Sequence, residues 1–458
     1  MSLTTGPISG LMERRQFLSA CGIAGLPFVL PSIAFSSEGQ QVRNQTFHVK
    51  DIGRTYPLIV INLDGGASHI DTLDPHPEAP VQIRSPYGAI QTTVPGVLVS
   101  ELMPQLSQEM DRIALWKNVY HRNGVHNQGS AIVHTGYDEV NSRSVEHSAL
   151  PINDSPMVHL SRERFQREGI GYLMLNSVHT VLPGAIQSNE ATVVTCDLSG
   201  NYKSPFEHKR LVLKERHEGR LDLLRSFDNR FTSPQVEKWK TLAGVAENVL
   251  DGDYGEAFDL SQVSDKERER YGRNELGNAV IIAKRLVQSG VQFILINDGD
   301  WDMHGQNNDH YLSNLDIRQQ EVRLSEVDEN GIQKKIILTG EGYARRLDRV
   351  LAALIKDFSD QAVIVVTTEF GRTPKLWYGW NNDRPPGRDH WPHQSFYMAF
   401  GGSVKPGVFG SSDNSGTING NDSAFHATLL AEATLNATGR ARVHSFSNER
   451  FDTLPQFK

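Results

Sequence analysis

Short apolar runs alternate with amphipathic stretches along most of the chain. A short apolar run that ends in a polar or glycine-containing turn is typical of a buried strand, and apolar positions that recur about every 3.6 residues are typical of a helix. Alternating strands and helices predict an α/β fold, with a mostly parallel sheet covered by helices on both faces. The expected strands cover residues 56–64, 114–120, 291–297, 362–368 and 395–401, and the expected helices cover residues 101–113, 264–290, 343–358 and 423–435.

Residues 137–232 interrupt this alternation. They are polar, rich in serine, histidine and arginine, and show no clean period of either kind. We interpret them as an insertion or cap within one catalytic domain that spans residues 50–458, rather than as an independent domain. Residues 328–340 are expected to form a small hairpin ahead of the next helix.

The N-terminus has the layout of a twin-arginine export signal. Arg14 and Arg15 precede a modestly apolar run, and small residues follow at Ser32 to Ala34, where cleavage is expected. Residues 1–34 are therefore predicted to be a Tat signal peptide. The Tat translocase is then an expected partner during export, and the mature protein is expected in the periplasm or outside the cell. A short amphipathic helix is the alternative for this segment, and lipidation is an alternative for Cys21.

Charge and cysteine content exclude several classes of function. The formal net charge is −8 and the pI is about 6.1, so neither a nucleic-acid groove nor an anionic membrane surface is expected as a partner. Beyond the signal, no apolar stretch reaches the ~18 residues that span a bilayer, so no stable membrane insertion is expected. Cys196 is the only cysteine after the signal, which rules out an intramolecular disulfide in the mature chain.

Acidic and histidine side chains lie at the ends of the expected strands. Asp64 and Glu369 each end one strand, the segment 297–310 (NDGDWDMHGQNNDH) follows another, and the cluster 387–394 precedes the last. Singly, each has an ordinary explanation as a turn, a solvated loop or a capping acid. Jointly they are expected to converge, because loops at the carboxyl ends of parallel strands share one edge of the sheet. Carboxylates with imidazoles suit a divalent metal, Zn²⁺ first, with Mn²⁺, Mg²⁺ or Ca²⁺ as alternatives.

Four motifs occur in the chain in an order that resembles the alkaline phosphatase superfamily: LIVINLDGG, DWDMH, VIVVTTEFGRTP and HWPHQSFYMAFGG. That superfamily includes phosphatases, sulfatases, phosphodiesterases and cofactor-independent phosphoglycerate mutases. The chain is most similar to a Tat-exported bacterial branch carried as a domain of unknown function. The resemblance covers most of the mature chain and is weakest over residues 137–232. It implies an alkaline phosphatase/sulfatase-like fold and the metal ligands Asp64, Asp300, His304, Glu369 and His390.

Two departures from the superfamily pattern bear on catalysis. Phe370 stands where the superfamily has a histidine, and the position of the superfamily nucleophile falls close to His126. We hypothesise that His126 supplies the missing imidazole and that metal-bound water attacks, with Ser130 among the nearby hydroxyls that could act instead. Arg372 is the expected clamp for an anionic ester, with a structural salt bridge as the alternative. The sequence has no formylglycine motif, so a formylglycine sulfatase is not expected.

These features predict an exported, metal-dependent hydrolase of a phosphate or sulfate ester. The expected substrate is an anionic ester, and an esterified polysaccharide is one candidate. The alternative is a catalytically degenerate protein of the same fold that binds metal or serves in assembly. Buried, mutually repelling carboxylates cost stability unless a cation neutralises them, which favours an active metal site. Asp298 and Asp302 are expected to support the ligands Asp300 and His304 from close by.

Overall fold

The computed structural model describes several stretches of the chain, which together hold the central sheet and its helices. The expected signal peptide (1–34) lies outside the described residues, and so does most of the expected cap (137–232). Of the expected cap, only residue 157 and the segments 172–176 and 193–196 are described, and these two segments contain strands of the central sheet. The described residues are 49–51, 56–121, 123–135, 157, 172–176, 193–196, 254–305, 312–327, 333–378, 385–402, 404–415, 425–426 and 440–442.

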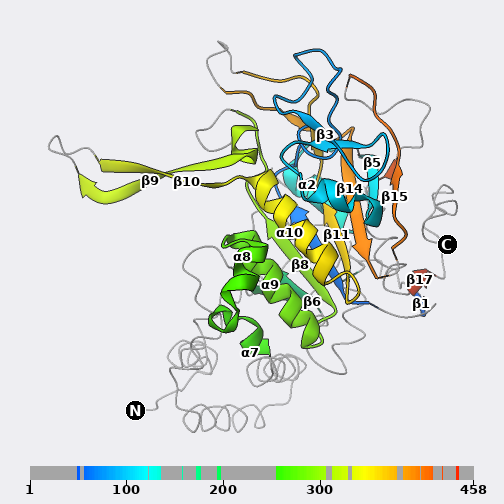
Figure 1. Ribbon diagram of the computed structural model, residues 1–458, viewed down its shortest axis with the longest axis vertical. Helices are drawn as coiled ribbons and strands as arrows, with labels where there is room; N and C mark the ends of the chain where they lie inside the picture. The colour runs from blue at the N-terminus through cyan, green and yellow to red at the C-terminus, as the bar shows by residue number, and fades with distance from the viewer. Residues whose placement is uncertain are drawn as a thin grey trace, which may run out of the picture.

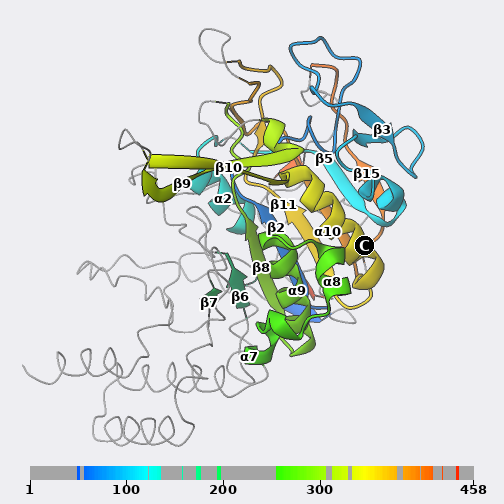
Figure 2. The ribbon, with the colours of Figure 1, turned by 60° about the vertical axis from the view of Figure 1, so that its left-hand side comes forward.

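A mixed, mostly parallel sheet forms the centre of the described part of the molecule (Figures 1 and 2). Its strands are β2 (Leu58–Leu63), β5 (Ala114–Tyr120), β6 (Tyr172–Leu175), β7 (Val193–Cys196), β8 (Phe293–Asp298), β11 (Val363–Thr367), β14 (Ser395–Gly401), β15 (Gly407–Phe409) and β16 (Phe425–His426). Their order is β15-β5-β14-β11-β2-β8-β6-β7, and β16 also pairs with β5. Only β14 runs antiparallel to its neighbours. The predicted fold class is confirmed.

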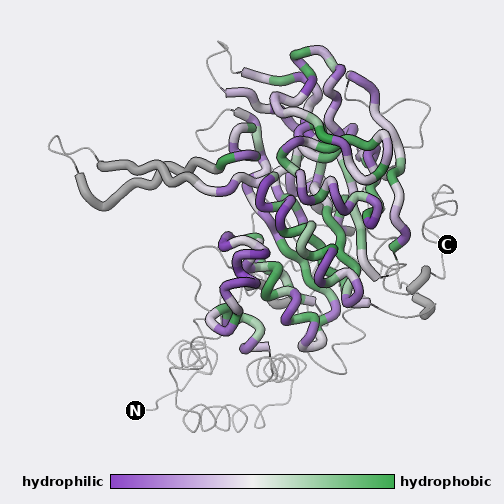
Figure 3. Tube along the Cα trace, in the orientation of Figure 1, coloured by the Kyte–Doolittle hydropathy of each residue, from purple (hydrophilic) through white to green (hydrophobic). Residues whose placement is uncertain are grey.

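Helices cover both faces of this sheet. The described helices are α2 (His126–Thr135), α7 (Tyr254–Ala257), α8 (Asp265–Tyr271), α9 (Glu275–Gln288) and α10 (Tyr343–Asp357). Every residue of β2 and β8 is buried, because a parallel strand covered on both faces has no solvent side. Ile59 packs into the same core cluster as Leu286 of α9, whereas its neighbour Val60 packs into the cluster that contains Ile132 of α2. Figure 3 shows hydrophobic residues concentrated along the sheet.

Two expected helices differ from the structure, and a third lies mostly outside the described residues. The helix expected at 264–290 is broken at Gly272, whose φ of 88° ends α8, and the Asn274 side chain then caps α9. Within 101–113 only a 3-10 helix, η2 (Leu106–Arg112), forms. Of 423–435 only β16 is described, and it is a strand. None of the described helices is long and apolar enough to cross a membrane.

The hairpin expected at 328–340 is larger than predicted. It pairs β9 (Ile317–Val327) with β10 (Gln333–Glu341), and Figure 1 shows it projecting from the body of the molecule. The remaining short elements are η3 (Leu260–Gln262), η4 (Leu312–Leu315) and the pairs β1 (Val49–Asp51) with β17 (Arg440–Arg442), β3 (Ala89–Gln91) with β4 (Leu98–Ser100) and β12 (Gly371–Arg372) with β13 (His390–Trp391).

Candidate metal centre

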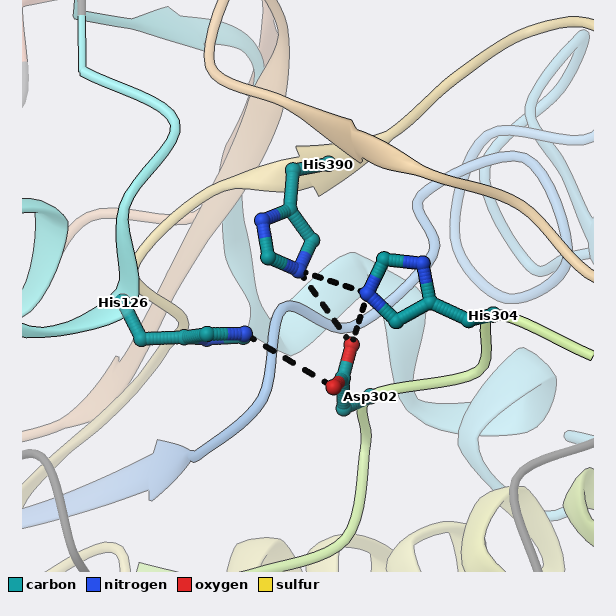
Figure 4. A group of neighbouring side chains, drawn as sticks. All are labelled: His126, Asp302, His304 and His390. Carbon is teal, nitrogen blue, oxygen red and sulfur yellow. Dashed lines mark hydrogen bonds and ion pairs between the residues drawn. The ribbon is translucent and has the colours of Figure 1, made fainter. Parts of the chain in front are cut away.

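Three histidines and one aspartate converge beyond the carboxyl end of the central strands (Figure 4). His126 is the first residue of α2, Asp302 and His304 lie in the loop after β8, and His390 begins β13. One ligand atom from each side chain lies within 4.8 Å of the others, which is close enough for all four to reach a single cation. The loops at this edge of the sheet therefore meet as the sequence predicted, and they form a cluster that could hold a metal.

The carboxylate of Asp302 is the centre of this cluster. Its Oδ1 lies 2.9 Å from Nε2 of His304 and 3.3 Å from Nε2 of His390, while its Oδ2 lies 3.7 Å from Nε2 of His126. The Nε2 atoms of His304 and His390 are only 2.8 Å apart. Two imidazole lone pairs at that distance repel each other unless a proton or a cation lies between them. This geometry fits a bound cation.

Each of the three histidines is held from outside the cluster through its other ring nitrogen. Nδ1 of His390 lies 2.8 Å from the carbonyl oxygen of Gly124, and Nδ1 of His126 lies 2.8 Å from Oε1 of Glu369. Nδ1 of His304 lies 3.3 Å from Oδ1 of Asp389. A hydrogen bond donated by Nδ1 leaves Nε2 with its lone pair facing the cluster, which is the arrangement that histidine ligands of metals usually adopt.

The loop after β8 turns sharply to bring Asp302 into place. Asp300 has a φ of 69°, and the next residue, Trp301, is fully buried, with its backbone N–H donating to the carbonyl of Asp64. Gly65 allows this close approach, because a Cβ there would lie 2.5 Å from the backbone nitrogen of Asp302. The φ of Gly65 is itself 113°, in the region that favours glycine. The Asp-Gly-Gly turn thus shapes the site with its backbone.

Arg372 fixes the position of Asp302. Its guanidinium is fully buried, Nη2 contacts Oδ1 of Asp302 and the carbonyl of Gly65, and Nε donates to the carbonyl of Gly66 at 2.7 Å. Nη1 donates to the carbonyl of Arg388 at 3.1 Å. Arg372 was expected to clamp the substrate, with a structural salt bridge as the alternative, and the structure shows the salt bridge. All three guanidinium nitrogens are occupied by groups of the chain itself.

The other expected ligands lie around the cluster. Glu369 is buried, and its Oε1 accepts from the backbone N–H of Gly65 at 2.8 Å as well as contacting His126. Asp64 is also buried, and its backbone N–H donates to the backbone carbonyl of Asp298. Asp300 is exposed, and its carboxylate accepts from the Tyr343 hydroxyl at 3.1 Å. The cluster thus contains Asp302 in place of the expected ligand Asp300. Asp64 and Glu369, which were also expected as ligands, are not among its four residues.

The hydroxyl of Ser130, the alternative nucleophile expected from the sequence, is buried in the protein. Ser130 lies one turn along α2 from His126, and its Oγ is buried without a hydrogen-bond partner among the described residues. Phe370 lies beside His126 and His390 and forms an apolar wall there. Its ring centroid lies 5.1 Å from that of His126 and 4.6 Å from that of His390. The wall keeps water from one side of both imidazoles.

The charges of the cluster shift the pKa values of its members. Burial alone would lower the pKa of His126, but hydrogen bonds and charges from Asp302 and Glu369 outweigh it and raise the pKa to about 9. Burial would raise the pKa of Asp302, but its contacts with the three histidines and Arg372 hold it far below its usual range. Burial lowers the pKa of His390, against the opposing effect of Asp302. Without a metal, His126 is therefore protonated at neutral pH, and His390 presents a neutral ring.

Replacing Arg372 by methionine is expected to lower the free energy of unfolding by about 3 kcal/mol, because it leaves Asp302 and three buried carbonyls without their partner. The matched control is Arg345→Met, which removes a pair with Asp316 whose side chains are more than a third exposed. That control is expected to cost less than about 1 kcal/mol. Urea denaturation of the metal-free proteins measures both, and equal losses would contradict the role assigned to Arg372.

Solved structures from several bacteria are similar to this chain. The C-terminal periplasmic domain of EcEptC from Escherichia coli, in complex with Zn, is 10% identical, with 86% of each chain covered and a TM-score of 0.35. The PsFucS1 sulfatase from Pseudoalteromonas sp. is 10% identical over 85% of this chain and 68% of that one, with a TM-score of 0.36. The alkaline phosphatase from the Antarctic bacterium TAB5 is 13% identical over 84% and 99%, with a TM-score of 0.37. At these scores the likenesses carry no argument about chemistry.

No curated protein sequence matches this chain. One family does match, over residues 56–444, and its description is "Protein of unknown function (DUF1501)". The matched range holds the central sheet and all four residues of the candidate metal centre. The chain therefore belongs to the DUF1501 family.

Proposed function

We propose that this protein is a metal-dependent hydrolase of an anionic ester, either a phosphate or a sulfate ester. The observation that carries the proposal is the arrangement of the three histidines. Each is held at Nδ1 by an outer acceptor, and each turns Nε2 toward the carboxylate of Asp302. A set of side chains arranged only for packing has no need of three imidazoles oriented in the same way around one carboxylate.

The ligand set favours zinc among the divalent metals. Three imidazole nitrogens and one carboxylate oxygen are typical zinc ligands, whereas magnesium and calcium prefer oxygen ligands throughout. Manganese accepts a mixed set and is the next alternative. When bound, such a cation withdraws charge from an ester oxygen and lowers the pKa of water. His126, Asp302, His304 and His390 would hold it.

Solvent access distinguishes this cluster from a closed structural site. The side chains of His126, His304 and His390 are 21–25% exposed, and that of Asp302 is 33% exposed. Structural zinc sites are usually closed, whereas catalytic sites keep one position open for substrate or water. The cluster lies at the carboxyl edge of the parallel strands, where ligands bind in sheets of this kind. We infer that a substrate ester approaches from this side.

The chain's own residues then have separate roles. Asp302 supplies the negative charge of the ligand set, and Arg372 holds that carboxylate in position. Glu369 orients His126 through Nδ1, so His126 presents Nε2 toward the position of the cation once that nitrogen has lost its proton. Phe370 shields the imidazole rings of His126 and His390 on one side. Because Ser130 is buried, we propose that water, rather than a serine hydroxyl, attacks the ester.

We further propose that the protein is exported by the Tat translocase and acts in the periplasm or outside the cell. The supporting features are Arg14, Arg15 and the apolar run after them. An ester carried on an extracellular polysaccharide would be a substrate that such an enzyme meets there. Export would also make the Tat translocase its partner before cleavage of residues 1–34.

The test is metal content together with hydrolysis of a panel of phosphate monoesters, phosphate diesters and sulfate esters. His304→Ala is expected to lose the metal and at least about a hundredfold in kcat/KM on the panel's best substrate. The matched control is His393→Ala, which removes an exposed histidine that packs edge-to-face against Trp391 outside the cluster. The control should keep both metal and activity. Unchanged metal content in His304→Ala would show that the cluster is not the metal site.

A metal-binding protein without catalytic activity is the second candidate. Two observations favour it: Phe370 replaces the expected histidine, and Arg372 is fully occupied inside the protein. Under this alternative the wild-type protein binds metal through the same four residues but hydrolyses no ester of the panel. Turnover that depends on the bound metal and on His304 would exclude it.

A further inference from the structure

The β9–β10 hairpin projects from the body of the molecule as a two-stranded arm (Figure 1). Among the described residues, β9 pairs only with β10, so its other edge is unpaired. A two-stranded hairpin is marginally stable alone in water, and an unpaired edge is a template for another strand. The free edge of β9 can therefore accept another strand. The charges along β9 indicate which strand fits it.

The charges of β9 are arranged symmetrically, with opposite signs, about Val322. Arg318 and Glu326 lie four positions to either side of it, and Glu321 and Arg323 lie one position to either side. If a second β9 runs antiparallel to the first with Val322 opposite Val322, each arginine stands opposite a glutamate. Charges on an edge strand also discourage unwanted pairing, but that role requires no such symmetry.

We propose that two copies of this chain associate through their β9 edges about a twofold axis at Val322. In the resulting sheet, with strand order β10-β9-β9-β10, Arg318 stands opposite Glu326 of the partner subunit and Glu321 stands opposite Arg323 of the partner subunit. Directly opposed residues of antiparallel strands are the nearest cross-strand neighbours, so these pairs stabilise this register. An interface that uses the same strand on both sides is the usual form of a homodimer.

The sequence of the hairpin supports this edge and this register. Arg323 is the register partner of Lys335 within the hairpin, so two basic residues occupy directly opposed positions. In the dimer Glu321 of the partner subunit adjoins Arg323 on its other side. The β10 edge offers no equivalent, because its two lysines and one glutamate cannot all be matched with a second copy of β10.

The dimer would also complete an apolar surface. Val322 and Ile336 are register partners, and positions 324 and 338 share their face because strand residues alternate. These positions hold valine, leucine and isoleucine, so one face of the hairpin is apolar along its middle. Joining two hairpins doubles that face in a four-stranded sheet, and three or more strands with an apolar face are what a free-standing sheet needs.

The experiment is sedimentation equilibrium of the full chain and of two charge-reversal variants, Glu321→Arg and Arg323→Glu. The wild type is expected to dimerise, and each variant alone to weaken the dimer at least about tenfold, because it opposes like charges across the axis twice. Mixing the two variants is expected to restore dimerisation as a heterodimer, in which arginines on one strand face glutamates on the other. A misfolded hairpin would not be rescued by mixing.

The matched control is Lys334→Glu, a charge reversal on β10 that leaves the β9 edge unchanged. It is expected to dimerise like the wild type, and all variants are expected to keep the wild-type metal content, since none of the changed residues belongs to the cluster. A wild type that stays monomeric at all concentrations overturns the proposal. So does a dimer that neither single reversal weakens, because its interface then lies elsewhere.

Discussion

Asp302→Asn is expected to weaken metal binding at least about a thousandfold. The change keeps the shape of the side chain but removes the negative charge and an oxygen that contacts His304 and His390. Loss of an outer hydrogen-bond partner typically costs ten- to a hundredfold in metal affinity, and loss of a ligand costs more. Competition with a chromophoric chelator, using Zn²⁺ as the probe, measures the dissociation constant.

The matched control for this prediction is Asp300→Asn, two residues earlier in the same loop. Asp300 is exposed and contacts the Tyr343 hydroxyl instead of the cluster, so its replacement should change metal affinity by less than about threefold. The two variants therefore distinguish Asp300, the ligand expected from the sequence, from Asp302, the ligand that the structure indicates. If Asp300→Asn loses the metal and Asp302→Asn keeps it, the ligand assignment is wrong.

Metal affinity is expected to rise about tenfold per pH unit from pH 6.5 to pH 9, roughly three-hundredfold in all. The pKa of His126 in the metal-free protein is raised to about 9, so below that pH a proton occupies the ring that the metal needs. Binding must then release this proton, and each pH unit below the pKa costs about tenfold in affinity. Affinity therefore falls as pH falls and levels off above pH 9. The lowered pKa of His390 works against a second linked proton.

Calorimetric titrations in two buffers of different ionisation enthalpy count the protons released on binding. The wild type should release about one at neutral pH, and the control His126→Gln should release about one fewer and show a flatter pH dependence. Equal proton release by the two proteins would mean that His126 does not carry the linked proton. A pH-independent affinity in the wild type would contradict the raised pKa itself.

The positions of the site at the strand ends could be read from the sequence. β2, β8 and β11 are continuous apolar runs, and such runs form buried parallel strands because no side of them faces water. Polar groups that follow these runs must gather at one edge of the sheet. His304 was expected there for that reason, His390 because its cluster immediately precedes the strand at 395–401, and His126 from the opposite wall. All three converge in the structure.

The choice among the acids could not be read from the sequence. Asp298 ends β8, and Asp300 and Asp302 follow it in the loop. An extended chain would turn all three side chains to the same side. The loop is not extended, because Asp300 adopts a left-handed conformation and Trp301 is buried in the core. Asp298 instead pairs with the buried Arg346 at 2.5 Å. A dihedral angle set by tertiary packing leaves no local pattern in the sequence that could have indicated Asp302.

Arg372 shows the same division between local sequence and tertiary structure. An arginine two residues after Glu369 at a sheet edge suits an anionic substrate equally well as it suits an internal salt bridge. Its burial beneath the Gly65–Gly66 turn decides between them, since a guanidinium with no solvent exposure and four partners on the chain is not available to a substrate.

By itself the sequence determined the apolar strands, the α/β class and the edge of the sheet at which histidines and acids collect, because these depend on the hydrophobicity and the periodicity of side chains, both of which are local properties. Only the tertiary structure decided that Asp302, not Asp300, joins His126, His304 and His390, and that Glu369 and Arg372 hold two of these residues in place. Those choices depend on which backbone turns fit against one another across a gap of hundreds of residues in the sequence. Such contacts have no local signature.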